Sequence, residues 1–274
     1  SEFSPCTRHI WHLPLNKPPK CEYTRPVYGW PGLGMIYDFP LNEKSRTYLR
    51  LESLFSQIRD NLESDQSWAH IAFFKGLFDL QELLERGDLR ADLIKDLERL
   101  GQRLSHWASL PDVDLEQIQR MQQESTQLSR SLLSSPRPGA RLKEDRLLGS
   151  IRQRFSIPGG LCAFDVPQLH HWLVTPAVGR HQQMQQWLSD INLLMNAISL
   201  LLRLWRESGH FSDQVATNGF FQDTAEGAEL IRIRLTGSQS CYPTLSGHKN
   251  RFALRFLPTT EQPIGDVSFQ LACC

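Results

Sequence analysis

The chain lacks both an excess of one charge and a long apolar run. Its 274 residues hold 30 Lys and Arg against 30 Asp and Glu, so no net field favours a nucleic acid. The most apolar run, from Ile191 to Leu202, is interrupted by polar residues and is shorter than the roughly 20 residues that a bilayer span requires. We therefore predict neither a nucleic-acid nor a membrane partner, and any electrostatic recognition must come from local groups of charge.

Motifs of common catalytic and metal sites are also missing. There is no GxxxxGK[ST] loop, no GxSxG turn and no HExxH pair. The adjacent His170 and His171 would diverge by about 100° on a helix, so they could not both face one metal. The six cysteines include no CxxC pair, which favours free thiols in a reducing cytoplasm over a disulfide framework. We predict a protein that is not an enzyme and that needs no cofactor or metal.

The first 34 residues lack the periodicity of a helix or a strand. They hold six prolines and end in a glycine-rich stretch, a composition typical of extended or disordered chain. Ser-Glu-Phe at the very start resembles a cloning scar, and Met35 resembles a natural initiator. Residues 1–34 are therefore predicted to be a leader or cloning-derived extension that is not native, with a functional arm as the alternative.

Helical periodicity begins after this extension. Tyr48, Leu51 and Phe55 begin an apolar stripe with steps of three and four residues, which is typical of one buried helix face. Asp88 and Asp114 are suited to cap later helices. We expect helices from Asn42 to Leu62, at about 68–85, after Asp88, after Asp114, at about 142–155 and at about 180–207.

Beyond Gly209 the apolar period changes to two, which is typical of strands. Strands are predicted at 230–235, 251–256 and 267–271, with a further one around 219–222 and a short one at 162–164. This order predicts an α+β fold, with an N-terminal mainly α-helical domain and a smaller C-terminal antiparallel β-strand domain. The helical domain would comprise residues 35–160 and 176–209, and the strand domain residues 161–175 and 210–274.

Arginines lie opposite the apolar faces of several predicted elements. In the strand at 251–256 the alternation puts Arg251 and Arg255 together on one face, and Arg232 and Arg234 alternate in the same way. If these strands are adjacent, the four arginines form a basic platform suited to carboxylates and mixed peptide ligands. On the helices, Arg50 and Arg146 point away from the apolar stripes. For any one arginine, a solvated face with scattered ion pairs is the alternative.

A series of motifs resembles the ZapD family. The similarity extends in order from Met35 to Cys274, whereas the first 34 residues have no counterpart. The motifs include Pro40-Leu41-Asn42-Glu43-Lys44, Glu85-Arg86-Gly87-Asp88-Leu89-Arg90, Ser156-Ile157-Pro158-Gly159-Gly160, Phe164-Asp165-Val166-Pro167, Asn218-Gly219-Phe220 and Ser246-Gly247-His248-Lys249.

The resemblance implies a cell-division adaptor, a symmetric homodimer in the cytoplasm at the midcell division ring. It implies binding to the C-terminal tail of the tubulin-like GTPase FtsZ, and bundling of FtsZ filaments. We expect a basic groove where the helical and strand domains meet. Carried over by motif, the binding residues would be Arg50, Arg86, Arg146, His170, Arg251 and Arg255, with Lys249 nearby. For Arg86 the sequence alone would favour a surface charge, and for His170 a packed or capping histidine.

Two other functional classes remain as alternatives. A nucleic-acid-binding module could use the same basic surface, although net neutrality and the lack of stacking aromatics among those arginines count against it. An enzyme could be centred on His170 with Asp165 or Cys162, which would require those side chains to lie within reach of one another.

Overall fold

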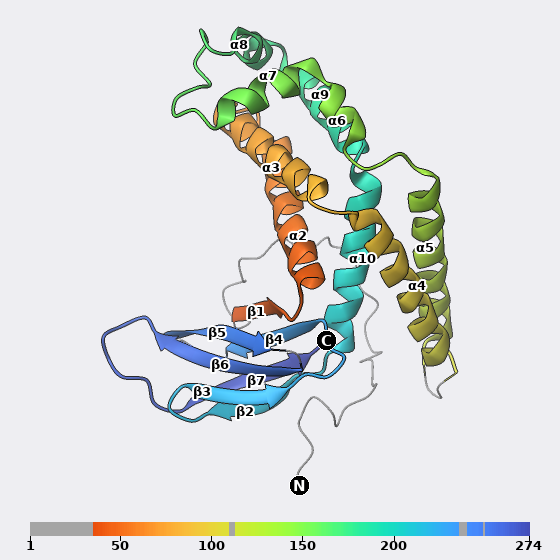
Figure 1. The fold of residues 1–274 in the computed structure, drawn as a ribbon, viewed down its shortest axis with the longest axis vertical. Helices are drawn as coiled ribbons and strands as arrows, with labels where there is room; N and C mark the ends of the chain where they lie inside the picture. Colours follow the sequence, from red (N-terminus) through yellow and green to blue (C-terminus); the bar gives the residue numbers. More distant parts are fainter. Residues whose placement is uncertain (1–34, 110–112, 236–239, 249) are drawn as a thin grey trace. The chain divides into compact units, whose positions relative to one another are not determined.

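The structure is a computed structural model, and it describes residues 35–109, 113–235, 240–248 and 250–274. Within these ranges one strand is followed by nine helices and then six strands (Figure 1). The predicted α+β class, with helices first and antiparallel strands last, is confirmed. The chain divides into two compact units. The sheet unit contains the described residues up to Leu49 together with Leu202–Cys274, and the helical unit is Arg50–Leu201.

The sheet unit contains two antiparallel sheets, with strand orders β1-β4-β7-β2 and β3-β6-β5. The strands predicted in the C-terminal part are confirmed as β3, β4, β6 and β7, whereas β1, β2 and β5 were not predicted. The bounds are β1 Met35–Pro40, β2 Ser212–Ala216, β3 Phe220–Thr224, β4 Leu230–Leu235, β5 Cys241–His248, β6 Arg251–Pro258 and β7 Val267–Cys273.

Apolar side chains from both sheets share one core. Phe256 of β6 and Phe269 of β7 lie 5.0 Å apart between ring centroids, and Phe221 of β3 meets Phe269 edge-on at 5.3 Å. Ile231 and Ile233 of β4 belong to the same buried cluster. Burying one such side chain contributes roughly 1.5–3 kcal/mol, so this alternation fixes which face of each strand points inward.

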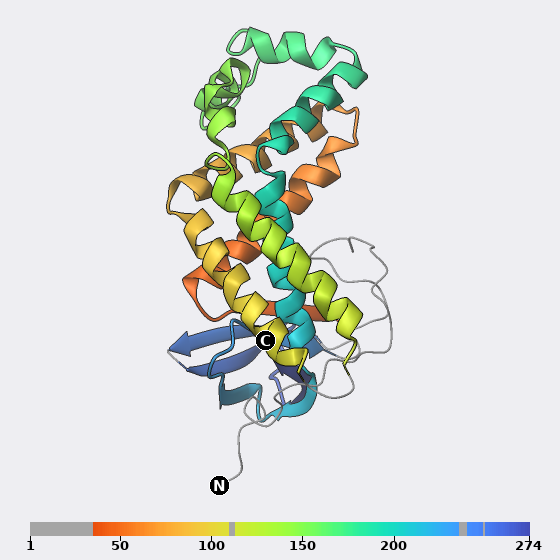
Figure 2. The ribbon, with the colours of Figure 1, turned by 90° about the vertical axis from the view of Figure 1, so that its right-hand side faces the viewer.

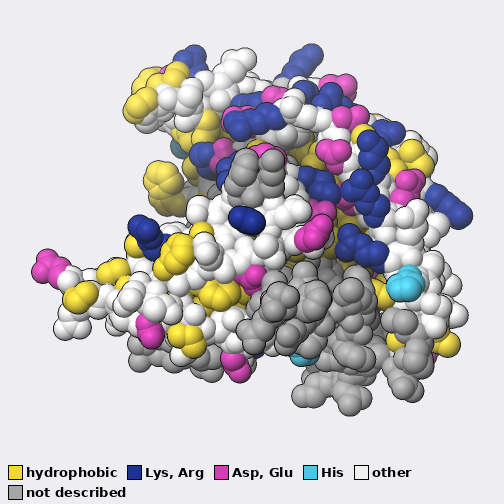
Figure 3. All heavy atoms as spheres, turned by 60° about the horizontal axis from the view of Figure 1, so that its bottom comes forward, with side chains coloured by type: hydrophobic (Ala, Val, Ile, Leu, Met, Phe, Trp, Pro, Cys, Tyr) yellow, Lys and Arg dark blue, Asp and Glu magenta, His cyan; other side chains and the backbone are white. Residues whose placement is uncertain are grey.

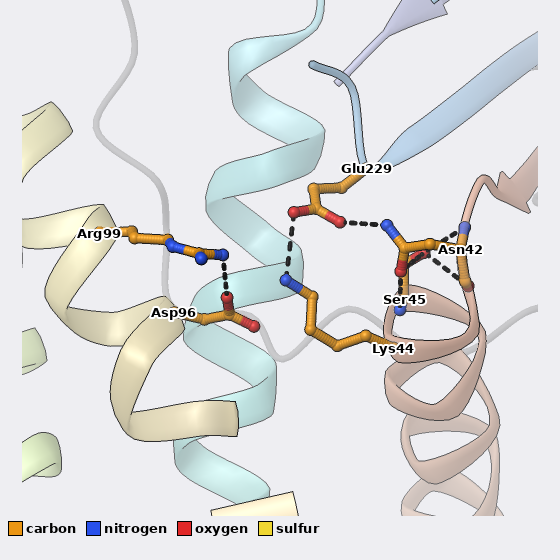
Figure 4. Close-up of polar contacts among 6 residues, drawn as sticks. All are labelled: Asn42, Lys44, Ser45, Asp96, Arg99 and Glu229. Carbon is orange, nitrogen blue, oxygen red and sulfur yellow. Dashed lines mark hydrogen bonds and ion pairs between the residues drawn. The ribbon is translucent and has the colours of Figure 1, made fainter. Parts of the chain in front are cut away.

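A polar network joins the start of α2 (Glu43–Leu62) to the turn before β4 (Figure 4). The Asn42 side chain accepts a hydrogen bond from the Ser45 backbone N–H (2.8 Å), as expected of an N-cap, and donates to Glu229 (2.6 Å). The Lys44 ammonium lies 3.2 Å from the same carboxylate. These contacts fix the connection between β1 and α2 against β4.

The helical unit contains seven complete helices and parts of α2 and α10 (Asn192–Ser208), which both continue into the sheet unit. Asp88 and Asp114 accept hydrogen bonds from Ala91 and Gln117 N–H, as the capping prediction expected. Helices α4 and α5 lie side by side in both views (Figures 1 and 2). The seven helices are α3 Ser67–Glu85, α4 Leu89–Trp107, α5 Leu115–Ser134, α6 Ala140–Glu144, α7 Arg146–Phe155, α8 Pro167–Val174 and α9 Ala177–Ser189.

Three predicted elements of the helical unit differ from the structure. The helix expected at 142–155 is two helices, because Asp145 ends α6 and caps α7 by accepting from Leu148 N–H (3.0 Å). The helix expected at 180–207 is also two, α9 and α10, which are bent by 65° at their break. The strand expected at 162–164 is wrong: these residues form turns that lead into α8.

In the described part of the chain, no single helix is long and apolar enough to cross a bilayer, and α9 and α10 reach that length and apolarity only when they are counted together across their bend.

His70 of α3 is a fully buried titratable group in the helical unit. Its ring meets Trp172 edge-on at 5.3 Å and lies 6.2 Å from His181. Burial lowers the pKa of His70 below its ordinary value, and the nearby Arg180 and His181 lower it further, while Asp65 opposes them. The folded protein therefore holds this imidazole neutral.

We expect stability to fall as pH decreases below about 6.5, the ordinary histidine pKa, because the unfolded chain then binds a proton that the folded chain excludes. The measurement is the Tm of the wild-type chain and of His70→Phe at about pH 7.5 and about pH 5.5. The wild-type Tm should fall more than that of the variant. Equal falls would show that His70 is not the cause.

Candidate functional site

Arg251 and Arg255 lie on β6, the central strand of the three-stranded sheet. Both are exposed, while the alternate Phe252 and Leu254 are buried in the core. The strand register places Phe220 of β3 opposite Arg255. We call the outward side of β3, β6 and β5 the arginine face.

The arginine face carries positive charge without a compensating carboxylate. Among the described residues, neither the Arg251 nor the Arg255 guanidinium has an ion-pair or hydrogen-bond partner. Asp223, the one acidic residue in these three strands, has an inward position opposite Phe252. Two free guanidinium groups are therefore available for an acidic ligand, and each can bind a carboxylate with two parallel hydrogen bonds.

The predicted platform of four strand arginines is wrong. Arg232 and Arg234 lie on β4, which belongs to the other sheet. Arg232 Nε lies 2.9 Å from Asp38 Oδ1, and Arg206 Nε lies 2.7 Å from Asp38 Oδ2. The Arg234 guanidinium lies 3.9 Å from the ring centroid of Phe211. Arg232 and Arg234 are thus half-buried and stabilise the sheet unit instead of facing a ligand. The prediction failed because alternation determines which face of a strand a residue occupies, but not which sheet the strand joins.

The cysteines of the sheet unit are unsuited to nucleophilic chemistry. Burial raises the pKa of the Cys241 thiol and raises that of Cys274 to about 12, so both stay protonated at neutral pH. Cys162, in the helical unit, is a free and exposed cysteine.

Arg86, Arg146 and His170 belong to the helical unit, and all three are exposed. Arg86 follows the last residue of α3 and pairs with Glu82, whereas Arg146 is the first residue of α7 and His170 lies on α8. Arg50 of α2 is exposed at the start of the same unit. Lys249 lies outside the described residues.

Glu85 holds together the helices that carry Arg86 and Arg146. Its carboxylate accepts two hydrogen bonds from Arg152 of α7, at 3.1 and 3.2 Å, and lies 3.1 Å from Lys143 of α6. The Arg152 and Lys143 contacts lower the pKa of Glu85 to about 2. Glu85 therefore stays charged at neutral pH, and its ion pairs with Arg152 and Lys143 fix the end of α3 against α6 and α7.

Glu85 and Asp145 support the basic residues, and neither role was predicted from the sequence. Asp145 caps α7 and also accepts from the indole N–H of Trp187 (2.8 Å), so it fixes the helix start where Arg146 lies. A signal was available for Asp145, since Asp before an apolar helical stripe is a common N-cap. No local pattern identifies Glu85, because its partners are 58 and 67 residues away.

The alternative enzyme site does not assemble in the described part of the chain. There His170 makes no side-chain hydrogen bond or ion pair with Cys162 or Asp165, and Asp165 faces Arg154 at 4.0 Å instead. The same described residues contain no cluster of three or more His, Cys, Asp or Glu side chains that could hold a metal ion. Basic and acidic side chains lie beside one another on the surface drawn in Figure 3, as the balanced composition leads one to expect.

The family can now be assigned from comparisons with known proteins. A model of the ZapD family, described as a cell division protein, matches residues 49–255. Cell division protein ZapD of Pectobacterium carotovorum subsp. carotovorum is 43% identical over 244 residues, covering 88% of this chain and 97% of that protein. The ZapD proteins of Pectobacterium atrosepticum and Klebsiella pneumoniae are each 44% identical over 244 residues, with 97% and 98% of their lengths covered. The chain belongs to the ZapD family.

ZapD membership confirms the resemblance that the sequence motifs indicated, and it makes this chain a Z-ring-associated cell-division protein. The ZapD match also spans the residues carried over by motif, on both units: Arg50, Arg86, Arg146, His170, Lys249, Arg251 and Arg255.

Proposed function

We propose that this ZapD-family protein binds the C-terminal tail of FtsZ and cross-links FtsZ filaments at the midcell division ring. The observation that carries the proposal is the arginine face, where Arg251 and Arg255 are exposed on one central strand without a carboxylate partner among the described residues. A tail with acidic and apolar residues suits such a face, because its carboxylates can form hydrogen-bonded ion pairs with the guanidinium groups of Arg251 and Arg255.

More than one contact is needed for useful affinity. An exposed ion pair contributes roughly 0–1 kcal/mol, so two arginines alone would hold a peptide weakly. We propose that Lys249 of the sheet unit and the basic residues of the helical unit add further contacts. Those residues are Arg50, Arg86, Arg146 and His170.

Bundling requires that one particle hold two filaments. We propose a homodimer in the cytoplasm that presents one tail-binding surface on each subunit. A filament offers many tails, so weak single sites gain from effective concentration once the first tail is bound. The dimer then acts as a cross-link without any chemical step.

The test is sedimentation of the chain with FtsZ polymerised in GTP, using full-length FtsZ and FtsZ without its C-terminal tail. We expect co-sedimentation and bundles with full-length FtsZ only. Co-sedimentation that is equal for both forms would move the binding site away from the tail. No co-sedimentation with either form would contradict the proposed function.

A further inference from the structure

The motif Asn218-Gly219-Phe220 forms a rigid turn at the edge of the arginine face. Asn218 and Gly219 have φ of 50° and 72°, and Thr217 bridges to Phe220, which is the geometry of a two-residue hairpin with an Asn-Gly centre. Gly219 O accepts from Phe256 N–H (2.8 Å), and Asn218 N–H donates to Asp266 (2.9 Å). These contacts fix the backbone at Phe220, the first residue of β3.

Phe220 points outward, where its apolar side chain gains no stabilisation from burial in the hydrophobic core. Its neighbour Phe221 fills the inward position and contacts Phe269, whereas Phe220 is 44% exposed opposite Arg255. Directly opposed side chains of an antiparallel pair have Cβ atoms about 4.5–5.5 Å apart. The two side chains therefore start from neighbouring positions on the outward face of the sheet.

A second exposed ring lies on the opposite side of Arg255. Tyr242 of β5 is 42% exposed, and its register partner is Leu257, two residues beyond Arg255 on β6. Such diagonal neighbours are about 7–8 Å apart, within reach of an aromatic side chain. The Arg255 end of the face thus has an aromatic ring on each flanking strand, with Leu257 half-buried beside them.

Scattered exposed apolar residues are ordinary, but this grouping combines the three residue types enriched in the centres of protein interfaces, Arg, Tyr and Phe. Its charge further narrows the choice of ligand. The two guanidinium groups have no partner among the residues that the structure describes, and these strands hold no acidic residue at an outward position, so the face repels basic segments and attracts acidic ones.

We propose that Phe220 and Tyr242 form an apolar subsite beside Arg255, which receives one large apolar side chain of the bound acidic peptide. The inference rests on the proposed function and adds a selectivity to it. An acidic segment with an apolar residue next to its carboxylate binds, while an equally acidic segment without one binds more weakly.

The probe is the FtsZ C-terminal tail peptide with a fluorescent label, together with versions in which each large apolar residue is replaced by serine in turn. We expect one replacement to weaken binding to the wild-type chain by about tenfold in fluorescence anisotropy, a factor typical of one lost apolar anchor. Phe220→Ser should weaken the parent peptide by a similar factor and should then be insensitive to that same replacement, as coupled partners are. Tyr242→Ser should behave in the same way.

Val215→Ser is the matched control, since Val215 is an exposed apolar residue of the sheet unit (55% exposed) on β2, outside the arginine face. It should keep both the affinity and the sensitivity to serine replacement. Phe220→Leu, which keeps an apolar side chain, should keep most of the affinity if Phe220→Ser proves poorly folded. Parent-peptide affinity unchanged in Phe220→Ser and Tyr242→Ser would overturn the subsite while leaving the proposed function intact. A wild-type chain that does not bind the parent peptide would overturn both.

Discussion

A chain carrying Arg251→Glu and Arg255→Glu should not bundle FtsZ filaments. Each substitution removes a donor for a tail carboxylate and sets a like charge in its place, which costs several kcal/mol at an interface. We expect light scattering of FtsZ polymerised in GTP to stay at the level measured without the chain. Loss of bundling then reports the loss of tail binding and not a change in FtsZ assembly.

The same double variant should fold as well as the wild-type chain. Both side chains are exposed, and their guanidinium groups have no partner among the described residues, so surface substitution changes stability by only about 0.5 kcal/mol. Its Tm and its mass in sedimentation velocity should match those of the wild type. Arg130→Glu, an exposed arginine of α5, is the charge-matched control and should still bundle filaments. Bundling by the double variant would show that the arginine face is not the binding surface.

Asp38→Ala should destabilise the sheet unit more than any surface substitution. The Asp38 carboxylate lies between Arg206 and Arg232, and the three side chains are only 18%, 24% and 16% exposed. Removing the carboxylate breaks the ion pairs that Asp38 makes with two half-buried guanidinium groups, which costs about 3 kcal/mol. For a chain of this length the loss should lower the Tm by on the order of 5–10 °C in a thermal melt followed by circular dichroism.

Asp213→Ala is the matched control for that measurement. Asp213 is also an acidic residue on a strand of the same sheet, but it is exposed and accepts a single hydrogen bond from Gln270 (3.0 Å). Its removal should change the free energy of unfolding by about 1 kcal/mol or less. Equal Tm values for Asp38→Ala and the wild type would contradict the structural role given to Arg232.

Alternation in the sequence was enough to place Arg251 and Arg255, because burial of Phe252 and Leu254 forces the arginines outward. The same reasoning failed for Arg232 and Arg234. Their outward position was right, but pairing of β4 with β1 and β7 is a contact between segments far apart in the chain. The local sequence pattern carries no information on that pairing. The apolar and basic residues therefore alternate in the same way around Arg232, which binds Asp38, and around Arg251 and Arg255, which lie on the arginine face.

The helices show a similar limit. Asp88 and Asp114 were identified as caps because a break in the apolar stripe precedes each of them. Asp145 interrupts a stretch that is helical on both sides, and its role depends on Trp187, 42 residues away. Strands β2 and β5 were missed because their sequences, SDQVA and CYPTLSGH, lack a strong alternation of apolar and polar residues.

In the helical unit, periodicity alone indicated Arg50 and Arg146, whereas Arg86 and His170 entered only through the family motifs. Arg86 directly follows α3 and His170 lies on α8, and both are exposed, where a basic side chain is most often an ordinary solvated group. The position of Arg86 is well defined in the structure, because the neighbouring Glu85 forms ion pairs with Arg152 and Lys143 that fix the end of α3. Whether Arg86 and His170 contact a tail is part of the proposed function.

The central claim is that the arginine face holds the FtsZ tail. Its most direct test is the affinity of the labelled tail peptide for the wild-type chain, for Arg251→Glu with Arg255→Glu, and for Arg130→Glu. We expect the double variant to bind at least about 100-fold more weakly than the wild type, corresponding to a loss of about 3 kcal/mol, and Arg130→Glu to bind like the wild type. Equal affinity of all three chains for the peptide would contradict the account.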